Sequence, residues 1–216
     1  MSHPRTSRSA PASLTERRKI ATQLDIARGA AELFSEKGPD GTTAEEIAAR
    51  AGVALRTFYR YFRSKQDAIG PLLSSGGDRW RLLLAETGPD VDLARALESA
   101  AVASFEPSGG LGGEEGLRWT RDLLRSAQSD PALRAVWYRV NQESEEQLLP
   151  VVGRLAGPDA DPLEVRLVAA AATAAIRVAL ERWATMDPDS GEIGSPVDLV
   201  VRCLRELTAG MRLLSP

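Results

Sequence analysis

The sequence predicts an all-α fold, in which a three-helix helix-turn-helix unit is followed by a larger helical body. Three observations support this fold class. Apolar residues recur at intervals of three and four along much of the chain, as they do on one face of a helix. The dipeptides Asp130-Pro131, Asp161-Pro162 and Ser195-Pro196 each place a capping side chain before a proline suited to a first helical turn. No segment shows the alternation of apolar and polar residues that is typical of a strand.

The composition excludes several classes of protein. With 216 residues and 43% hydrophobic content, the chain can bury a sizeable core. It has no apolar run near the roughly 20 residues needed to cross a bilayer and no signal-like N-terminus, so we expect a cytoplasmic protein without membrane contact. One cysteine and one histidine allow neither an internal disulfide nor a Cys/His metal cluster, and no catalytic motif is present. We therefore expect no metal, no cofactor and no enzymatic activity.

The first helix is predicted between Thr15 and Lys37. Its apolar stripe, with three- and four-residue spacing, consists of Ile20, Leu24, Ala27, Ala31 and Phe34. The Gly-Pro-Asp-Gly run at 38–41 ends this helix. Residues 1–13 have no periodicity and are expected to form a disordered tail. Arginines in that tail could track a phosphate backbone, although an unselective solvated tail is the simpler interpretation.

The stretch 42–65 has the pattern of two short helices joined by a tight turn. Thr43 precedes the first of them and Glu46 follows three positions later, as in a capping box. Gly52 supplies backbone suited to the turn. Apolar side chains point inward from both helices: Ile47, Ala48 and Ala51 from the first, and Val53, Phe58, Tyr61 and Phe62 from the second.

The outer side of the second helix carries basic, hydroxyl and other contact residues. These are Leu55, Arg56, Thr57, Tyr59 and Arg60. A helix of this width fits the DNA major groove, where arginine can bridge two acceptors on guanine. An ordinary surface helix with a solvated basic face is the alternative for so short a stretch. The charge distribution is compatible with DNA contact, because residues 1–70 hold 12 Lys and Arg against 8 Asp and Glu, whereas residues 71–216 hold 15 against 22.

The segment IAARAGVALRTFYRYFRSK resembles the helix-turn-helix of the TetR family of bacterial regulators, and IARGAAELFSEKGPDGTT upstream is similar to the family's first helix and its exit. At Ala54 the family often has Ser or Thr, so one cap bond commonly worth about 1 kcal/mol is absent. The resemblance implies that Tyr59 and Lys65 contact the DNA backbone, while Arg56 is the strongest candidate for reading bases. The full set of candidate DNA-binding residues is Thr43, Leu55, Arg56, Thr57, Tyr59, Arg60 and Lys65.

The rest of the chain is predicted to be a helical body. Pro71 and Gly76-Gly77 interrupt the helix that follows Lys65, so we expect a kink or a break there. Further helices are expected over VDLARALESAAVASF and EEGLRWTRDLLRSAQ, and from about positions 131, 162 and 196, with a loop at 108–113. The predicted division is therefore a tail at 1–13, a DNA-binding domain at 14–70, and a ligand-binding and dimerisation domain at 71–216.

The last two helices carry apolar seams suited to packing on other helices. Either they pack on their own chain, or they form half of a four-helix dimer interface, and the family resemblance implies the dimer. The candidate interface residues are Val168, Ala172, Ala175, Ala179, Val200, Leu204, Leu207 and Met211.

Aromatic and polar residues of the body are compatible with a pocket for a lipophilic or aromatic molecule, although aromatics at helical spacing are more often core. The candidate ligand-binding residues are Phe105, Arg118, Trp119, Trp137, Tyr138, Asn141 and Trp183. By resemblance, an unknown small-molecule effector bound there would release the DNA.

The function that these expectations describe is that of a homodimeric, ligand-responsive transcriptional repressor binding an inverted-repeat operator in double-stranded DNA. Two alternatives remain open. One is a ligand-independent activator or architectural DNA-binding protein, and the other is a helical small-molecule-binding protein that no longer binds DNA.

Overall fold

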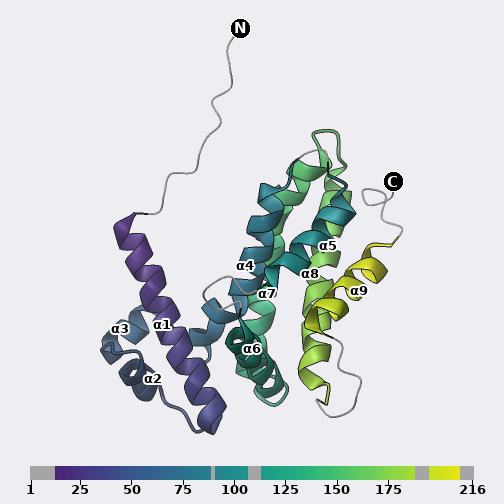
Figure 1. The fold of residues 1–216 in the computed structure, drawn as a ribbon. Helices are drawn as coiled ribbons and strands as arrows, with labels where there is room; N and C mark the ends of the chain where they lie inside the picture. The colour runs from purple at the N-terminus through teal and green to yellow at the C-terminus, as the bar shows by residue number, and fades with distance from the viewer. Residues whose placement is uncertain (1–12, 89–90, 107–112, 188–194, 210–216) are drawn as a thin grey trace.

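The computed structural model describes residues 13–88, 91–106, 113–187 and 195–209, and this part of the chain is helical with no strand. The helices are α1 Leu14–Lys37, α2 Ala44–Arg50, α3 Leu55–Tyr61, the short 3-10 helix η1 Asp67–Ile69, α4 Gly70–Glu86, α5 Leu93–Ser104, α6 Glu114–Ser126, α7 Pro131–Ala156, α8 Pro162–Thr185 and α9 Pro196–Thr208. Helices α1, α2 and α3 form one side of the molecule, and α4 to α9 form the body beside them (Figure 1). The predicted all-α fold class is confirmed.

Local capping explains where the helices of the body begin. Helices α7, α8 and α9 start at the three predicted prolines, where the missing N–H costs no helical hydrogen bond. The residue before each proline accepts a hydrogen bond from the first turn: Asp130 from the N–H groups of Ala132 and Leu133, Asp161 from Leu163, and Ser195 from Val197. The predicted starts near 131, 162 and 196 are confirmed.

The expected break in the helix after Lys65 is not present, because α4 runs without interruption from Gly70 to Glu86. Pro71 lies in the first turn, where a proline removes no hydrogen bond of the helix. Gly76 and Gly77 lie inside α4, and a Cβ atom at Gly77 would come within 3.1 Å of the Ser144 Oγ of α7. Close packing of α4 on α7 at Gly77 thus offsets part of the low helix propensity of the glycine pair, whereas Gly76 is exposed.

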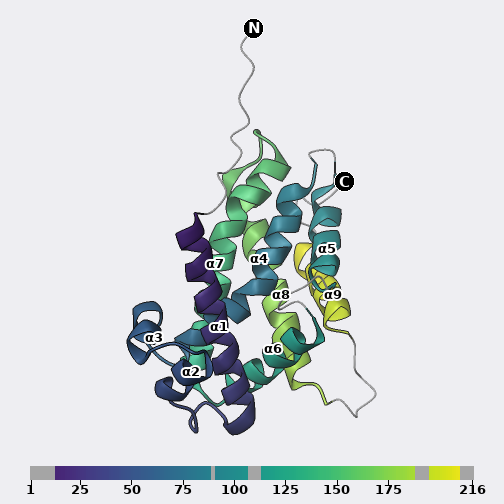
Figure 2. The same cartoon turned by 60° about the vertical axis from the view of Figure 1, so that its left-hand side comes forward.

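Buried apolar side chains form two clusters. The first joins α1, α2, α3 and the start of α4 to α6 and the first half of α7. The second joins the rest of α4 to α5, α8, α9 and the second half of α7. Helix α1 contacts α2 as well as α4 and α6, so it lies between the short helices and the body (Figure 2).

Two expectations fall on residues outside the described part of the chain. The predicted tail at 1–13 lies there except for Ser13, whose side chain accepts from the N–H of Glu16 at the start of α1. The predicted loop at 108–113 lies there except for Gly113, the N-cap of α6.

We predict that Gly76→Ala stabilises the protein. The position is exposed inside α4, and a Cβ atom there meets nothing within 4 Å. Alanine should therefore raise the free energy of unfolding by about 0.5–1 kcal/mol, as measured by urea denaturation followed by circular dichroism. Gly77→Ala is the matched control, because its new methyl group meets Ser144 and should bring a smaller gain or a loss. Equal gains at both positions would contradict this explanation.

Candidate functional site

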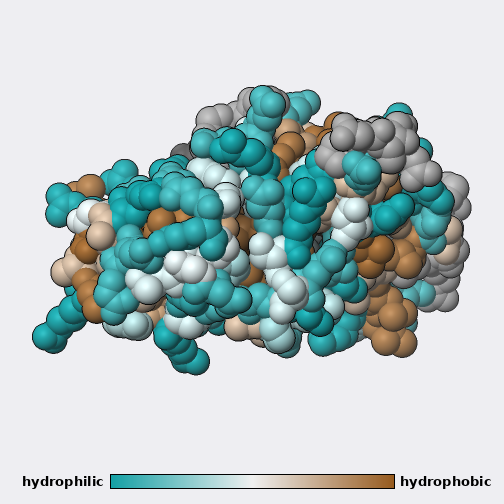
Figure 3. All heavy atoms as spheres, turned by 90° about the horizontal axis from the view of Figure 1, so that it is seen from below, coloured by the Kyte–Doolittle hydropathy of each residue, from teal (hydrophilic) through white to brown (hydrophobic). Residues whose placement is uncertain are grey.

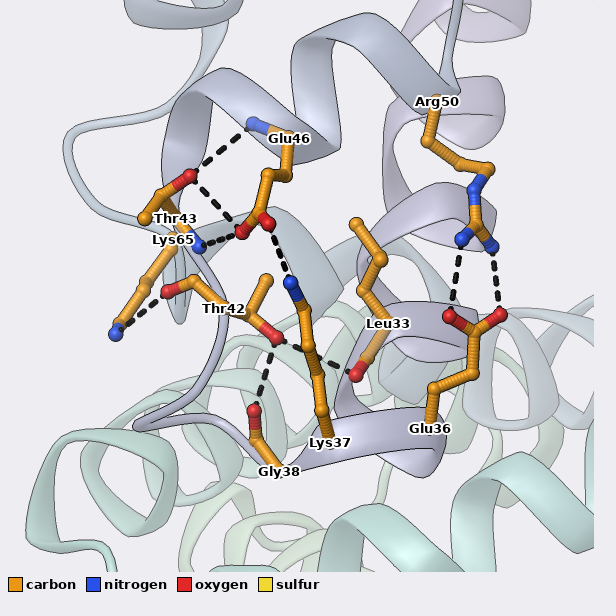
Figure 4. Close-up of polar contacts among 9 residues, drawn as sticks. All are labelled: Leu33, Glu36, Lys37, Gly38, Thr42, Thr43, Glu46, Arg50 and Lys65. Atoms are coloured by element: carbon orange, nitrogen blue, oxygen red, sulfur yellow. Dashed lines mark hydrogen bonds and ion pairs between the residues drawn. The ribbon is translucent and has the colours of Figure 1, made fainter.

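The α2–turn–α3 unit is built by local hydrogen bonds. Thr43 caps α2, since its hydroxyl accepts from the N–H of Glu46 at 3.2 Å while the Glu46 carboxylate accepts from the N–H of Thr43 at 2.8 Å (Figure 4). This is the predicted capping box. Gly52 has a φ of 67°, in the left-handed region that favours glycine, and it turns the chain between the helices. Ala54 is the N-cap of α3 and makes no side-chain cap bond, as expected.

Two phenylalanines hold α3 against the other helices. Phe58 and Phe62 are buried, and their rings lie 5.8 Å apart between centroids. They fix which side of α3 faces outward. On that side Arg56 and Arg60 are exposed, and the side chain of Tyr59 is 54% exposed. The structure therefore brings these three predicted residues onto one outward face.

Three of the other four predicted DNA-binding residues are more enclosed, whereas the fourth, Thr43, is exposed. Leu55 and Thr57 are half-buried, and Leu55 packs partly against the first core cluster. Lys65 is half-buried, and its ammonium donates to the carbonyl oxygen of Thr42 at 2.9 Å. The hydroxyl of Thr42 in turn donates to the carbonyl of Gly38 at 2.9 Å (Figure 4). Lys65 thus ties the segment after α3 to the turn between α1 and α2.

The two arginines on the outer face of α3 differ in the contacts that they make within the chain. The guanidinium of Arg60 lies 4.8 Å from the ring centroid of Tyr61 and donates to its hydroxyl at 3.2 Å. Within the described residues, Arg56 has neither a hydrogen-bond partner nor an ion pair. Arg56 is therefore the one of the two whose donors are available to an external acceptor.

Ion pairs fasten α2 to α1. Arg50 forms two hydrogen bonds with the Glu36 carboxylate, at 2.9 and 3.0 Å, and a third with Glu32 at 3.0 Å. The bond from Arg50 lowers the pKa of Glu36. Lys37 donates to Glu46, and this bond together with those from Thr43 lowers the pKa of Glu46 to about 2 (Figure 4). These acidic groups neutralise Lys37 of α1 and Arg50 of α2, whereas Arg56 and Arg60 of α3 form no ion pair among the described residues.

A cavity of about 1140 Å³ lies between α1 and the body. The α1 side of its wall includes Ile20 and Leu24, and the end of α3 contributes Tyr61 and Phe62. The body contributes side chains from α4, α6, α7 and α8. The cavity is therefore bounded by the helix-turn-helix unit on one side and by the body on the other.

Three of the seven predicted ligand-binding residues lie on the wall of this cavity: Phe105, Trp137 and Asn141. Of these, Asn141 donates to the carbonyl of Trp137 at 2.8 Å. Trp137 also donates through its indole N–H to Glu181 at 2.8 Å, so its orientation is fixed.

The other four predicted ligand-binding residues do not line this cavity. Trp119 is buried in the first core cluster, and Trp183 is buried with the guanidinium of Arg121 5.4 Å from its ring centroid. Tyr138 is 50% exposed, although it lines a smaller cavity of about 370 Å³. Arg118 is exposed near Glu115. Helical spacing showed that these residues lie on helices, but not which side of each helix meets the cavity.

Sequence reasoning missed cavity residues on α1, α4 and α8. Ile20 and Leu24 were assigned to the apolar stripe of α1, although they face the cavity. Arg79 and Thr173 also line it and carried no motif. The pair of glycines in α4, which leaves room beside the helix, was the one signal that could have pointed here.

Six of the eight predicted dimer-interface residues are buried inside their own chain. Their exposed fractions are 1% or less, and they are Val168, Ala172, Ala175, Ala179, Val200 and Leu204. A second copy cannot reach these side chains, so this part of the prediction is corrected: the seam packs α8 and α9 on each other and on the body. Leu207 is 44% exposed, and Met211 lies outside the described residues.

A different face of α8 is apolar and exposed. Leu163, Leu167 and Val178 are 62%, 51% and 42% exposed, and their spacing places them on one side of the helix. Hydrophobic atoms gather on the right of Figure 3, the side on which Figure 1 shows α8 and α9. These three side chains of α8, and Leu207 of α9, are therefore open to contact.

Other classes of site receive no support within the described residues. No group of three His, Cys, Asp or Glu side chains is placed to hold a metal ion, and no helix is both long and apolar enough to cross a bilayer. Cys203 is half-buried, and burial raises the pKa of its thiol, which fits a packing role.

Comparisons with known proteins agree with this geometry. Residues 19–68 match the family model described as "Bacterial regulatory proteins, tetR family", and residues 91–212, more than half of the chain, match the model described as "MftR C-terminal domain". The chain is 28% identical over 173 residues to the HTH-type transcriptional regulator TcmR of Streptomyces glaucescens, an alignment that covers 79% of this chain and 76% of TcmR. It is 34% identical over 89 residues to the HTH-type transcriptional repressor Rv3405c of Mycobacterium tuberculosis, covering 39% of this chain and 47% of that relative, so it spans about half of the latter's length.

Solved structures share the fold. The repressor AlkX from a Dietzia strain superposes with a TM-score of 0.58 at 17% identity, covering 89% of this chain and 99% of AlkX. FadR from Thermus thermophilus superposes with a TM-score of 0.51 at 22% identity, covering 88% of this chain and 94% of FadR.

We predict that Glu46 contributes to acid sensitivity. Its pKa falls from an ordinary 4.5 to about 2 in the folded chain, because Lys37 and then Thr43 donate to it. A carboxyl with a lowered folded pKa stabilises the fold above its unfolded pKa, and this contribution is lost as the pH falls through the folded value. Stability measured by urea denaturation should thus decline between pH 4.5 and about 2 more steeply in the wild type than in Glu46→Gln.

Glu45→Gln is the matched control, because Glu45 is an exposed neighbour on α2 that makes no such contact among the described residues. It should keep the wild-type slope. Identical slopes for wild type and Glu46→Gln would contradict the assignment.

Proposed function

The chain belongs to the TetR family of bacterial transcriptional regulators, which are not enzymes, and from that membership we propose that it is a homodimeric repressor that an effector releases from DNA. One observation carries the proposal. The wall of the large cavity is formed both by the helix-turn-helix side, through α1 and the end of α3, and by the body. A ligand in this cavity touches the part that reads DNA and the part that would hold two copies together.

The outer face of α3 would enter the major groove. Arg56 has free donors and would bridge acceptors on a base, while Tyr59 and Arg60 beside it would hold phosphates or base edges. The half-buried Thr57 and Leu55 flank this face and would complete the contact. Thr43 and Lys65 would contact the DNA backbone at either end of this face. In this proposal residues 14–70 are the DNA-binding domain and residues 71–216 the ligand-binding and dimerisation domain.

The second copy would dock on the exposed face of α8. Leu163, Leu167 and Val178 are apolar and open to solvent there, and Leu207 of α9 is exposed as well. A twofold axis through such a face brings the same patch of each copy together and presents two α3 helices to one side of the duplex. The expected operator is therefore an inverted repeat in double-stranded DNA, read in the cytoplasm.

Release of DNA by the effector requires that the effector bind the DNA-bound and the DNA-free conformations with different affinities. Polar contacts join the helix-turn-helix side of the chain to the body, and a ligand in the cavity could shift them. Arg139 of α7 pairs with Asp67 of η1 at 2.8 Å, and Ser35 of α1 donates to Asp122 of α6 at 3.1 Å. An effector that spreads α1 from the body would strain these bonds and change the spacing of the α3 helices.

Selection from random-sequence duplexes, followed by sequencing at two salt concentrations, tests the proposal. An enriched inverted repeat whose affinity falls with salt supports a dimeric sequence reader. Sequence-blind, salt-sensitive binding would instead favour an architectural protein. No DNA binding by the effector-free protein would favour a helical small-molecule-binding protein.

We predict that Arg56→Ala loses discrimination between the selected operator and a scrambled duplex by about 1–3 kcal/mol, because it removes a bidentate base contact. Fluorescence anisotropy with both duplexes measures it. Lys65→Ala is expected to weaken both duplexes alike. If Arg56→Ala lowered both affinities equally, Arg56 would be a phosphate contact and not a base contact.

We predict that Leu167→Glu separates the copies, because it places a charge in an apolar interface. The dimer dissociation constant should rise by about tenfold or more, as measured by analytical ultracentrifugation. Val102→Glu is the control, since Val102 is likewise an exposed apolar residue, at 42% against 51% for Leu167, but lies on another helix, α5. A dimer unaffected by Leu167→Glu would show that the copies meet elsewhere.

A further inference from the structure

Two buried polar atoms on the wall of the large cavity have no hydrogen-bond partner within the described residues. They are the hydroxyl oxygen of Thr173 in α8 and the Nε of Arg79 in α4. An unpaired buried polar group costs free energy, so it persists in a folded protein where something else requires it. A bound ligand is one such reason, and both residues line the same cavity.

Thr173 differs from three other threonines in the helices of this chain. A threonine in a helix commonly donates to the carbonyl four residues earlier, and Thr22, Thr120 and Thr208 do so at distances of 2.9, 2.8 and 2.5 Å. Thr173 is only 6% exposed, and its hydroxyl oxygen has no hydrogen-bond partner among the described residues. Its hydroxyl is free to bind a polar group inside the cavity.

Arg79 carries a positive charge that no carboxylate of the described residues neutralises. One of its terminal nitrogens donates to the carbonyl of Ala103 at a long 3.4 Å, and its Nε has no acceptor. Of the other charges on the same wall, Arg139 binds Asp67 at 2.8 Å, while Arg63 and Glu143 form no ion pair among the described residues but are exposed to solvent. The nearby Asp78 does not form an ion pair with Arg79, because it pairs with Arg81 at 2.7 Å.

The unpaired groups of this wall would be satisfied by a ligand that carries a planar, anionic hydrogen-bond acceptor on an apolar molecule. A guanidinium presents two parallel N–H donors that match a carboxylate, and such charge-assisted bonds are stronger than neutral ones. The rest of the wall offers large apolar surfaces from Leu24, Phe105, Trp137, Ile176 and Leu180. One unneutralised, partly buried cation suits a group with a single negative charge.

We propose that the cavity binds a lipophilic carboxylic acid, with its carboxylate paired to Arg79 and a second polar contact from Thr173. This inference rests on the proposed function and deepens it, because it names the chemical class of the effector. The apolar part of the acid lies toward α1, so its length would determine how far α1 is moved from the body.

Isothermal titration calorimetry of the full chain with three probes tests the proposal: decanoate, decan-1-ol and decyltrimethylammonium. The probes share an apolar chain and differ in the charge of the head group. The wild type should bind decanoate about tenfold or more tightly than decan-1-ol, and the cation most weakly. Arg79→Gln should remove the preference for decanoate while leaving the affinity for decan-1-ol within about twofold.

Arg81→Gln is the matched control, because Arg81 lies two positions further along α4 and is not part of the wall. It should keep the preference for decanoate. Arg79→Lys guards against a loss caused by misfolding, since it keeps the charge and should retain part of the preference. The proposal is overturned if the wild type binds acid and alcohol alike, if it binds neither, or if Arg79→Gln keeps the preference.

Thr173→Val tests the second contact with two measurements. Valine has the same shape without the unpaired hydroxyl, so it should raise the melting temperature of the ligand-free protein and weaken decanoate severalfold. Unchanged decanoate affinity would remove Thr173 from the proposal. These titrations contain no DNA, so they test ligand binding separately from release of the operator. If decanoate binds but does not release the selected duplex, the carboxylate site stands and the effector role is refuted.

Discussion

The burial of α1 on two sides is the constraint on which the rest of the structure depends. Ile26, Ala30 and Phe34 are fully or almost fully buried, although they belong to a helix near the edge of the molecule. The cluster that contains them joins α2 and α3 to α6 and α7. A helix buried in this way cannot shift against one neighbour without disturbing the other, because packed interiors resist small displacements. The position of α3 is therefore mechanically tied to the body.

Polar groups are fully hydrogen-bonded at one end of α1 and partly unpaired near the other. Near its C-terminus the ion pairs and cap bonds of Lys37, Glu46 and Arg50 are complete, and they fix α2 where it begins (Figure 4). Toward its N-terminus α1 borders a cavity whose wall keeps polar atoms unpaired. Satisfied networks hold one geometry, whereas unsatisfied groups in a hollow are available to a ligand. The helix-turn-helix unit is therefore held rigidly, whereas the region of α1 beside the cavity can respond to a ligand.

Much of the fold followed from local rules that act within a few residues. Asp130, Asp161 and Ser195 mark helix starts because a capping oxygen and a proline need only each other and the next turn. The Thr43 and Glu46 pair is equally local, and the face of α3 follows from the spacing of Phe58 and Phe62. For the same reason the outward positions of Arg56, Tyr59 and Arg60 could be predicted without knowing what lies beyond the helix.

The sequence by itself determined the helical class, most helix starts, the capped helix-turn-helix and its outward face. Only the tertiary structure decided which side of each body helix is buried, because an apolar stripe looks the same whether it meets its own chain or a second copy. The seam of α8 and α9 proved internal, and α4 stayed unbroken, with Gly77 packed against Ser144 of α7. The pairing of Arg79 and Thr173 with one cavity likewise depends on contacts between helices far apart in the chain, which no local pattern encodes.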